Sequence, residues 1–309
     1  MDKKQYGRGM FRERPLPDER IELKPTDRQI RWLRFLNLHG PLPSQYLFDL
    51  EGEKTDSQRR VAQKQLQRLW LGGYIYRPRS LWETANANYN HYCYDLDDKG
   101  KAYLKENDLW INALRPTGWM VHQLFVSCVT ATMDIMCQRE GYTYIPPHEY
   151  LGKHELTVKV AFVGNDGVRY LKPLTADAVF AIDYGDESYL AFALEADRNN
   201  ETSKSKSNNP DLKTDQRCIR QYHNFITTKQ YVKDFGRDEQ LVMLFVTTTE
   251  VKVRRLLKRL EEEKAKFILI GLVPEFDRPF KPPGLLKHLF NDKWIRPAGK
   301  KPFTIKKTA

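Results

Sequence analysis

Three segments of helical periodicity lie close together near the start of the chain, separated only by short breaks. The first begins at Thr26, where Gln29 three residues later completes a capping box, and it ends at Gly40. A second, shorter helix begins at Ser44, and the third covers residues 55–71, before a Gly-Gly pair. Three short helices in this order are typical of a helix-turn-helix core.

Two β-prone runs follow these helices, at residues 74–78 and 92–96, with a polar stretch between them. Such a pair predicts a β-hairpin, and a hairpin directly after a helix-turn-helix core is a wing. Asp97 is placed to cap a closing helix over residues 99–106. We therefore predict a winged-helix DNA-binding domain over residues 25–115.

The third helix has an apolar face, and the opposite face is polar and basic. The expected apolar face consists of Val61, Ala62, Leu66, Leu69 and Trp70. The residues predicted to contact DNA, including one from the hairpin, are Gln58, Arg59, Arg60, Gln63, Lys64, Gln67 and Arg77. Arginine and glutamine read base edges, and lysine contacts phosphates. A solvated helix surface would have the same composition, but the position in the three-helix set favours DNA contact.

The charge balance points in the same direction. The 309 residues include 51 Lys and Arg against 40 Asp and Glu, a formal net charge of +11, which favours a polyanionic partner. No secretory signal and no run of 18 apolar residues is visible, so we expect a cytoplasmic protein without a membrane partner. The four cysteines lack zinc-ligand spacing and no phosphate-cradling GxxxxGK[ST] segment occurs, so neither zinc nor a nucleotide is expected.

A second domain is predicted to follow Pro116, after which a long helix is expected. The apolar and polar segments after this helix predict several strands, then a helix, a strand, a basic helix and a last strand. Elements in this order predict a mixed α/β domain built on a sheet. The predicted organisation is a flexible basic arm (1–24), the winged helix (25–115), the α/β domain (116–275) and a Pro/Lys-rich tail with little regular structure (276–309).

Acidic residues occur at the ends of two of the apolar strands. Asp177 opens one strand, and Glu195 and Asp197 end the next. Strand alternation places Glu195 and Asp197 on one face. Carboxylates gathered in this way repel one another unless a cation neutralises them, and Mg²⁺ prefers such oxygens. The alternative is that these acids face water or pair with nearby arginines.

A D…ExK arrangement on adjacent strands resembles the restriction-endonuclease-like PD-(D/E)xK nucleases. Here Asp177 and Glu195 match the acids, and Asp197 stands where the pattern has lysine. A winged helix followed by a sheet carrying "AD" and then "LEADR" resembles the plasmid replication-relaxation family over roughly residues 26–272. The resemblance implies an α+β protein with a restriction-endonuclease-like domain, acting on double-stranded DNA of a mobile element together with other replication or mobilisation proteins.

The missing lysine affects the expected chemistry. That lysine positions the attacking water and offsets charge in the transition state, which Asp197 cannot do. Lys213, Arg217 or Arg220 could reach the site instead. The expected catalytic set is Asp177, Glu195, Asp197 and Lys213, with Asp177 and Glu195 as the Mg²⁺ ligands.

Three functions remain open at this point. The chain could be a metal-dependent DNA endonuclease or nickase. It could be a non-catalytic DNA-binding assembly factor with a degenerate nuclease domain. It could also be a winged-helix transcription regulator whose second domain forms a homodimer. The carboxylates favour the first function, and the absent lysine favours the second.

Overall fold

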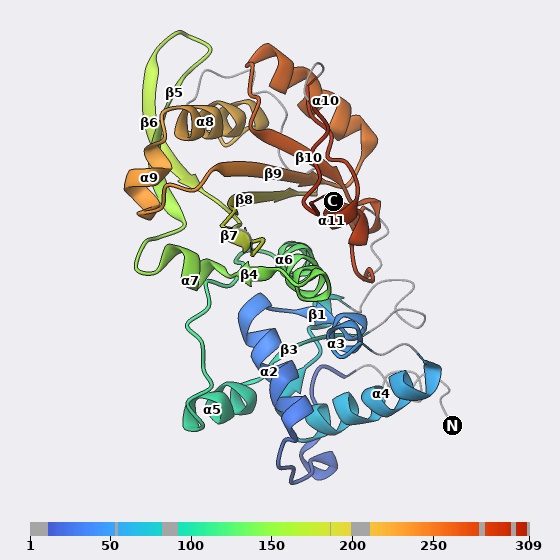
Figure 1. The fold of residues 1–309 in the computed structure, drawn as a ribbon. Helices are drawn as coiled ribbons and strands as arrows, with labels where there is room; N and C mark the ends of the chain where they lie inside the picture. The colour runs from blue at the N-terminus through green and yellow to red at the C-terminus, as the bar shows by residue number, and fades with distance from the viewer. Residues whose placement is uncertain are drawn as a thin grey trace, which may run out of the picture. The chain divides into compact units, whose positions relative to one another are not determined.

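The computed structural model describes residues 12–52, 55–81, 92–185, 187–198, 211–277, 282–297 and 301–307. Helices and strands are mixed along the chain, as predicted for an α+β protein (Figure 1). The chain forms two compact units: residues 1–135 with 278–285, and residues 136–277 with 286–309. The division therefore falls beyond the boundary predicted near Pro116.

The first unit contains the three predicted helices, α2 (Asp27–His39), α3 (Ser44–Leu50) and α4 (Asp56–Leu71). The side chain of Thr26 accepts a hydrogen bond from the backbone N–H of Gln29, which confirms the predicted capping box at the start of α2. The same device begins α4, where Thr55 is the capping residue. Both helices therefore begin where local sequence fixes them.

A small antiparallel sheet accompanies these helices. Its order is β1-β3-β2, with β1 at Leu42–Pro43, β2 at Ile75–Tyr76 and β3 at Cys93–Leu96. The pairing of β2 with β3 confirms the predicted hairpin strands, whereas most of the polar stretch between them, residues 82–91, lies outside the described residues. A 3-10 helix, η2 (Arg79–Leu81), follows β2. Asp97 caps α5 (Asp98–Glu106), as expected.

One residue of the predicted apolar face of α4 is misplaced. Ala62, Leu66 and Leu69 are fully buried, but Val61 is 51% exposed. The three buried residues recur at four- and three-residue spacing, so they share one face, while Val61 is turned by about 100° from Ala62. Val61 therefore belongs to the exposed face.

The described part of the N-terminal arm is packed against the first unit. A 3-10 helix, η1 (Pro17–Glu19), lies within it. Arg14 Nε lies 2.8 Å from Asp97 Oδ2. The carbonyl oxygen of Glu13 accepts hydrogen bonds from the indole of Trp70 and from the backbone N–H of Arg77. At the other end of the sequence, the Gly284 carbonyl accepts a 2.9 Å hydrogen bond from the buried hydroxyl of Tyr46. The first unit thus includes residues from both ends of the chain.

Helix α6 (Met120–Glu140) passes through the division between the units. The long helix was predicted, and every residue from 124 to 137 on it is buried, so this stretch has no solvent-exposed face. Polar residues are accommodated there by hydrogen bonds: Asp134 and Thr130 both bind the buried His39 ring. The helix has the length and the mean hydropathy (1.3) of a membrane span, but 78% of the apolar window is buried in the protein, as in a core helix.

The second unit is built on a mixed five-stranded sheet of order β10-β9-β8-β7-β4. Its strands are β4 (Thr143–Ile145), β7 (Ala178–Asp183), β8 (Tyr189–Asp197), β9 (Leu241–Thr247) and β10 (Ile268–Leu272). The pairs β4–β7 and β7–β8 are antiparallel, and β8–β9 and β9–β10 are parallel. Strands β7 to β10 correspond to predicted runs, and the short β4 was not predicted, like the following α7 (Pro147–Leu151).

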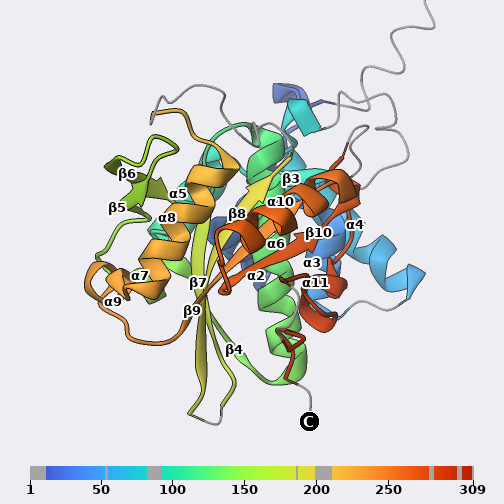
Figure 2. The ribbon, with the colours of Figure 1, turned by 90° about the horizontal axis from the view of Figure 1, so that it is seen from above.

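Helices α8 (Asp215–Thr227) and α10 (Glu250–Glu262) lie on the same face of this sheet (Figure 2). Each one connects two neighbouring parallel strands, and right-handed crossovers in one direction place both helices on one side. The short α9 (Gln230–Phe235) lies between α8 and β9 in the sequence. Both long helices begin near the carboxyl ends of β8 and β9, which is where open α/β sheets bind their ligands.

Strands β5 (Thr157–Val163) and β6 (Arg169–Thr175) form a hairpin of their own rather than part of the main sheet. The hairpin is held by α8: the Gln221 amide donates to the Lys172 carbonyl at 3.0 Å, and the Asn224 amide donates to the Ala161 carbonyl at 3.1 Å. Side-chain hydrogen bonds to strand carbonyls therefore attach this hairpin to the helix.

The predicted tail contains more structure than expected. After η4 (Pro274–Phe276), helix α11 (Lys287–Asn291) forms, and Trp294 pairs with Phe303 as an isolated β-bridge. Phe290 and Ile305 are fully buried. Gly271 leaves room for this segment, because a side chain there would collide with Trp294. Apolar residues among the prolines thus complete the core of the second unit.

The packing of α5 yields a test of the first unit. A Cβ added at Gly100 would overlap the backbone carbonyl of Tyr74. We expect Gly100→Ala to lower the free energy of unfolding by about 1–3 kcal/mol, although alanine is the better helix former by about 1 kcal/mol. Chemical denaturation measures this. Ala102 is exposed on the same helix, so Ala102→Gly measures the difference in helix propensity between alanine and glycine without a packing effect. A Gly100→Ala protein that is more stable than wild type would contradict the close packing against Tyr74.

Candidate functional site

The pairing of β7 with β8 brings the predicted acids together. Ala178 is the register partner of Leu194, and the backbone N–H of Asp177 donates to the Leu194 carbonyl at 2.9 Å. Asp177 directly precedes β7, so this hydrogen bond places its backbone beside the end of β8 that carries Glu195. Asp197, two residues after Glu195, lies on the same face of β8 as Glu195.

Asp177 lies immediately before β7 and is half-buried. Its Oδ2 accepts a 2.7 Å hydrogen bond from the backbone N–H of Ala196, the residue between the other two acids. This bond holds the Asp177 carboxylate beside β8. The backbone and the side chain of Asp177 are therefore both hydrogen-bonded to β8.

Glu195 is only 5% exposed and binds two side chains from the segment around α8. The Tyr222 hydroxyl donates to Oε1 at 2.8 Å, and the Lys213 ammonium donates to Oε2 at 3.3 Å. Burial and the neighbouring Glu195 carboxylate raise the pKa of the Tyr222 hydroxyl well above its usual range, so this hydroxyl stays a donor. Lys213 was predicted for the site, and its side chain remains 48% exposed.

Asp197 is 7% exposed and has a partner that the sequence analysis missed. The ammonium of Lys252 lies 2.6 Å from Asp197 Oδ2 and 2.7 Å from Asp215 Oδ2. Burial alone would lower the pKa of Lys252, but the two carboxylates outweigh that effect and raise it above its ordinary value. Lys252 is in the first turn of α10. In the sequence it is one of several basic residues of this helix, and nothing there marks it as the partner of Asp197.

The cluster formed by Asp177, Glu195, Asp197, Asp215, Lys213 and Lys252 is called the carboxylate cluster below. It brings four carboxylates and two ammonium groups together, three of the carboxylates buried and that of Asp177 half-buried. Carboxylates gathered in this way are stabilised by cations, whether side chains or a bound ion. The cluster is located at the carboxyl ends of β8 and β9.

The donor set fits a hard divalent ion in type, because Asp177 and Glu195 supply carboxylate oxygens from adjoining segments of the chain. Among the residues that the structure describes, no group of three or more His, Cys, Asp or Glu side chains is arranged to hold a metal. In a metal-bound form, Asp177 and Glu195 would be the protein ligands and water would supply the others.

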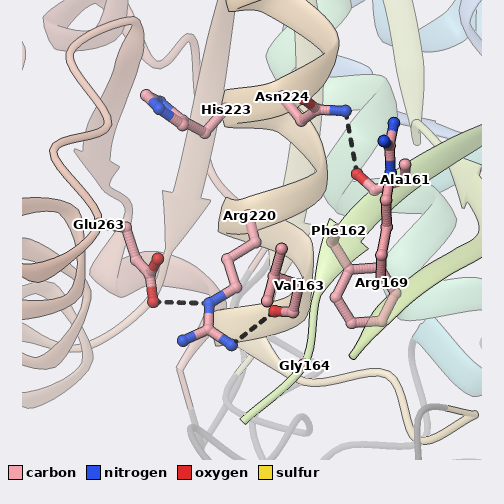
Figure 3. Close-up of a pocket in the computed structure, with 9 residues that line it drawn as sticks. All are labelled: Ala161, Phe162, Val163, Gly164, Arg169, Arg220, His223, Asn224 and Glu263. Atoms are coloured by element: carbon pink, nitrogen blue, oxygen red, sulfur yellow. Dashed lines mark hydrogen bonds and ion pairs between the residues drawn. The ribbon is translucent and has the colours of Figure 1, made fainter. Parts of the chain in front are cut away.

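The other cations considered for the lysine role bind the β5–β6 hairpin instead. Arg220 Nε donates to Glu263 at 2.7 Å, and its Nη1 donates to the Val163 carbonyl at 2.9 Å (Figure 3). These residues line a pocket of about 580 Å³. The guanidinium of Arg217 donates to the Pro173 carbonyl at 3.0 Å. Both arginines therefore have a structural role in attaching the hairpin.

The predicted DNA-reading residues of α4 lie on its open side. The exposed members of the set are Gln58, Arg60, Gln63, Lys64 and Gln67. Arg59 is half-buried, and the buried side of the helix is formed by the apolar residues described above. The helix thus presents a polar and cationic surface, as the sequence indicates.

Arg77 is the exception among the predicted DNA contacts. It is only 7% exposed, and its guanidinium carbon lies 4.3 Å from the centre of the Trp70 ring and 4.2 Å from that of Tyr92. A guanidinium over aromatic faces is held by cation–π attraction. Arg77 therefore packs the hairpin onto α4 and is not an outward-pointing contact to the DNA backbone.

The fold and the carboxylate cluster define an α+β protein with acids gathered at one end of its main sheet, and the sequence identifies its family. Residues 33–241, more than half of the chain, match the family described as replication-relaxation. The chain belongs to that family, which points to a function related to replication of a plasmid or another mobile element, involving DNA or the replication machinery. No match was found among curated proteins or solved structures.

The cluster predicts a large difference between its two lysines. Replacing Lys252 by Met leaves two buried carboxylates facing each other, so we expect a loss of about 3–5 kcal/mol in the free energy of unfolding at neutral pH. Lys213→Met, at a half-exposed pair, is expected to cost about 1 kcal/mol or less. Denaturant titration measures both, and equal losses would contradict the buried pairing.

The pH dependence follows from the raised pKa of Lys252. The charged ammonium stabilises the folded protein fully below the ordinary lysine pKa of 10.5. This stabilisation is lost as the pH rises through the higher pKa of Lys252 in the folded protein. The difference in the free energy of unfolding between wild type and Lys252→Met is therefore expected to stay constant from neutral pH up to that region and then to decrease. Denaturant titration at a series of pH values measures this difference.

Proposed function

We propose that the protein binds double-stranded DNA of a mobile element and cleaves or nicks it with Mg²⁺. In this proposal the first unit is a winged helix and the second is a restriction-endonuclease-like domain. The observation that carries it is the pair of hydrogen bonds that join Asp177, just before β7, to the end of β8 that carries Glu195, since the D…ExK pattern has its acids on adjacent strands.

The first unit supports a winged-helix interpretation through its order of elements. Three helices are followed by the paired strands β2 and β3, and β1 completes a three-stranded antiparallel sheet. Helix α4 is the third helix, and its open face carries the cations Arg60 and Lys64. A recognition helix occupies this position in helix-turn-helix proteins, where it enters the major groove.

The second unit supports cleavage through the chemistry of the carboxylate cluster. Asp177 and Glu195 would hold the metal, which supplies an activated water and polarises the phosphate. The Tyr222 hydroxyl orients Glu195 through its hydrogen bond. The half-exposed ammonium of Lys213 is placed to offset negative charge on a bound phosphate.

A second function, that of a non-catalytic assembly factor, is favoured by one observation. Asp197 stands where the pattern has lysine, and the cation nearest to it, Lys252, is buried between two carboxylates. An ammonium held in this way is kept from a substrate. In that case the second unit would bind DNA or a replication protein without cutting.

Cleavage is tested with supercoiled DNA in Mg²⁺ or Mn²⁺. We expect wild type to convert it to nicked or linear forms, and Asp177→Ala and Glu195→Ala to lower the rate by at least about a hundredfold, because each removes a metal ligand. Gel analysis over time gives the rates.

Glu263→Ala is the matched control, since this acid binds Arg220 away from the carboxylate cluster. It is expected to keep the wild-type rate. If wild type leaves DNA intact with either metal while still binding it, the assembly function replaces the nuclease function.

DNA binding by α4 is tested through its salt dependence. We expect Arg60→Ala and Lys64→Ala each to weaken binding and to reduce the slope of log K against log salt by about one, because each loses a phosphate contact. Fluorescence anisotropy with a labelled duplex measures both quantities. Lys258→Ala is the control, because it removes a cation from the exposed side of α10 instead of α4. If the slope of log K against log salt is unchanged in all three variants, α4 is not part of the DNA interface.

A further inference from the structure

A second feature of the first unit lies beside the exposed face of α4. A pocket of about 410 Å³ opens there, and α4 and the β2–β3 region supply most of its wall. The residues used below are Gln63, Gln67, Trp70, Arg77, Tyr92 and Tyr94. This group is called the aromatic pocket.

Flat side chains dominate the aromatic pocket. The Arg77 guanidinium lies over the rings of Trp70 and Tyr92. The Glu13 carbonyl anchors two of these groups, because it accepts hydrogen bonds from the Trp70 indole at 3.0 Å and from the Arg77 backbone at 3.0 Å. The planes are therefore held in place before any ligand arrives, which reduces the entropy lost on binding.

Polar groups are placed at the α4 side of the same pocket. Gln63 and Gln67 are one helical turn apart and both are exposed. Neither amide has a hydrogen-bond partner among the residues that the structure describes. Each amide therefore offers a donor and an acceptor next to the flat walls.

We propose that the aromatic pocket receives one unpaired nucleobase of the DNA that α4 binds; this inference rests on the proposed function. Aromatic rings and guanidinium planes stack on bases, and glutamine amides pair with base edges. A phosphate is the poorer occupant, since among the described residues of the lining Arg77 is the one cation and the acid Glu19 lies beside it in the same wall. The nearby cations Arg60 and Lys64 would hold the flanking backbone.

The test compares three duplexes of the same length: fully paired, with a single bulged adenine, and with an abasic site at the bulge. The bulged and abasic duplexes carry the same phosphates, so their affinity ratio isolates the base. We expect wild type to prefer the bulged adenine over the abasic bulge by between about fivefold and a hundredfold. Replacing that adenine by 2-aminopurine is expected to give quenched emission on binding, from stacking.

Two variants remove different parts of the pocket. Tyr92→Leu deletes a ring but keeps an apolar side chain, and Gln67→Ala changes an exposed residue that the fold does not need. Both are expected to bring the affinity ratio toward one. Arg60→Ala is the matched control, expected to weaken binding to all three duplexes equally and to leave the ratio unchanged. Circular dichroism verifies that each variant is folded.

The outcomes separate this inference from the function on which it rests. If wild type binds the paired duplex with the expected salt dependence but shows a ratio near one, the base pocket is rejected and DNA binding stands. A wild-type preference that survives in both Tyr92→Leu and Gln67→Ala also rejects it. Failure to bind any of the three duplexes rejects both proposals together.

Discussion

The second unit depends on one buried ion pair network in which the Lys252 ammonium binds the carboxylates of both Asp197 and Asp215. These residues come from the end of β8, the start of α8 and the first turn of α10. The network therefore fixes where both crossover helices begin relative to the strand that carries Glu195. Because charges this deeply buried are costly unless paired, the arrangement tolerates little displacement of any member. The position of Glu195 against Tyr222 and Lys213 follows from that constraint.

Part of the site could be predicted from patterns that involve only residues close together in the sequence. Alternation along one strand was sufficient to place Glu195 and Asp197 on a common face, and the apolar runs on either side of the acids predicted the strands β7 and β8. A capping box likewise gave the start of α2, and glycine stops gave the ends of α2 and α4, because those signals lie within a few residues of the boundary. In each of these cases the interacting groups are close in the sequence or are connected by a single turn.

Other features depend on contacts between distant segments, which a single sequence does not reveal. Lys252 is 55 residues from Asp197, and on α10 nothing distinguishes it from its basic neighbours except the face that packs on the sheet. Arg77 was expected to point outward, yet three aromatic residues near it make a buried cation favourable. The separate β5–β6 hairpin and the packed C-terminal segment have the same origin, since local propensity specifies a strand or a turn but not its neighbour.

The hydrogen bond from Tyr46 to the carbonyl of Gly284 has a consequence for the order in which the protein can form. Gly284 belongs to the first unit but follows all five strands of the second unit's sheet in the sequence. A nascent chain that ends before Gly284 lacks this acceptor, and the Tyr46 hydroxyl then keeps its 3.3 Å contact with the Thr132 hydroxyl. The missing hydrogen bond is worth about 1 kcal/mol. The N-terminal helices can therefore assemble early, but this bond forms only after the strands of the second unit have been made.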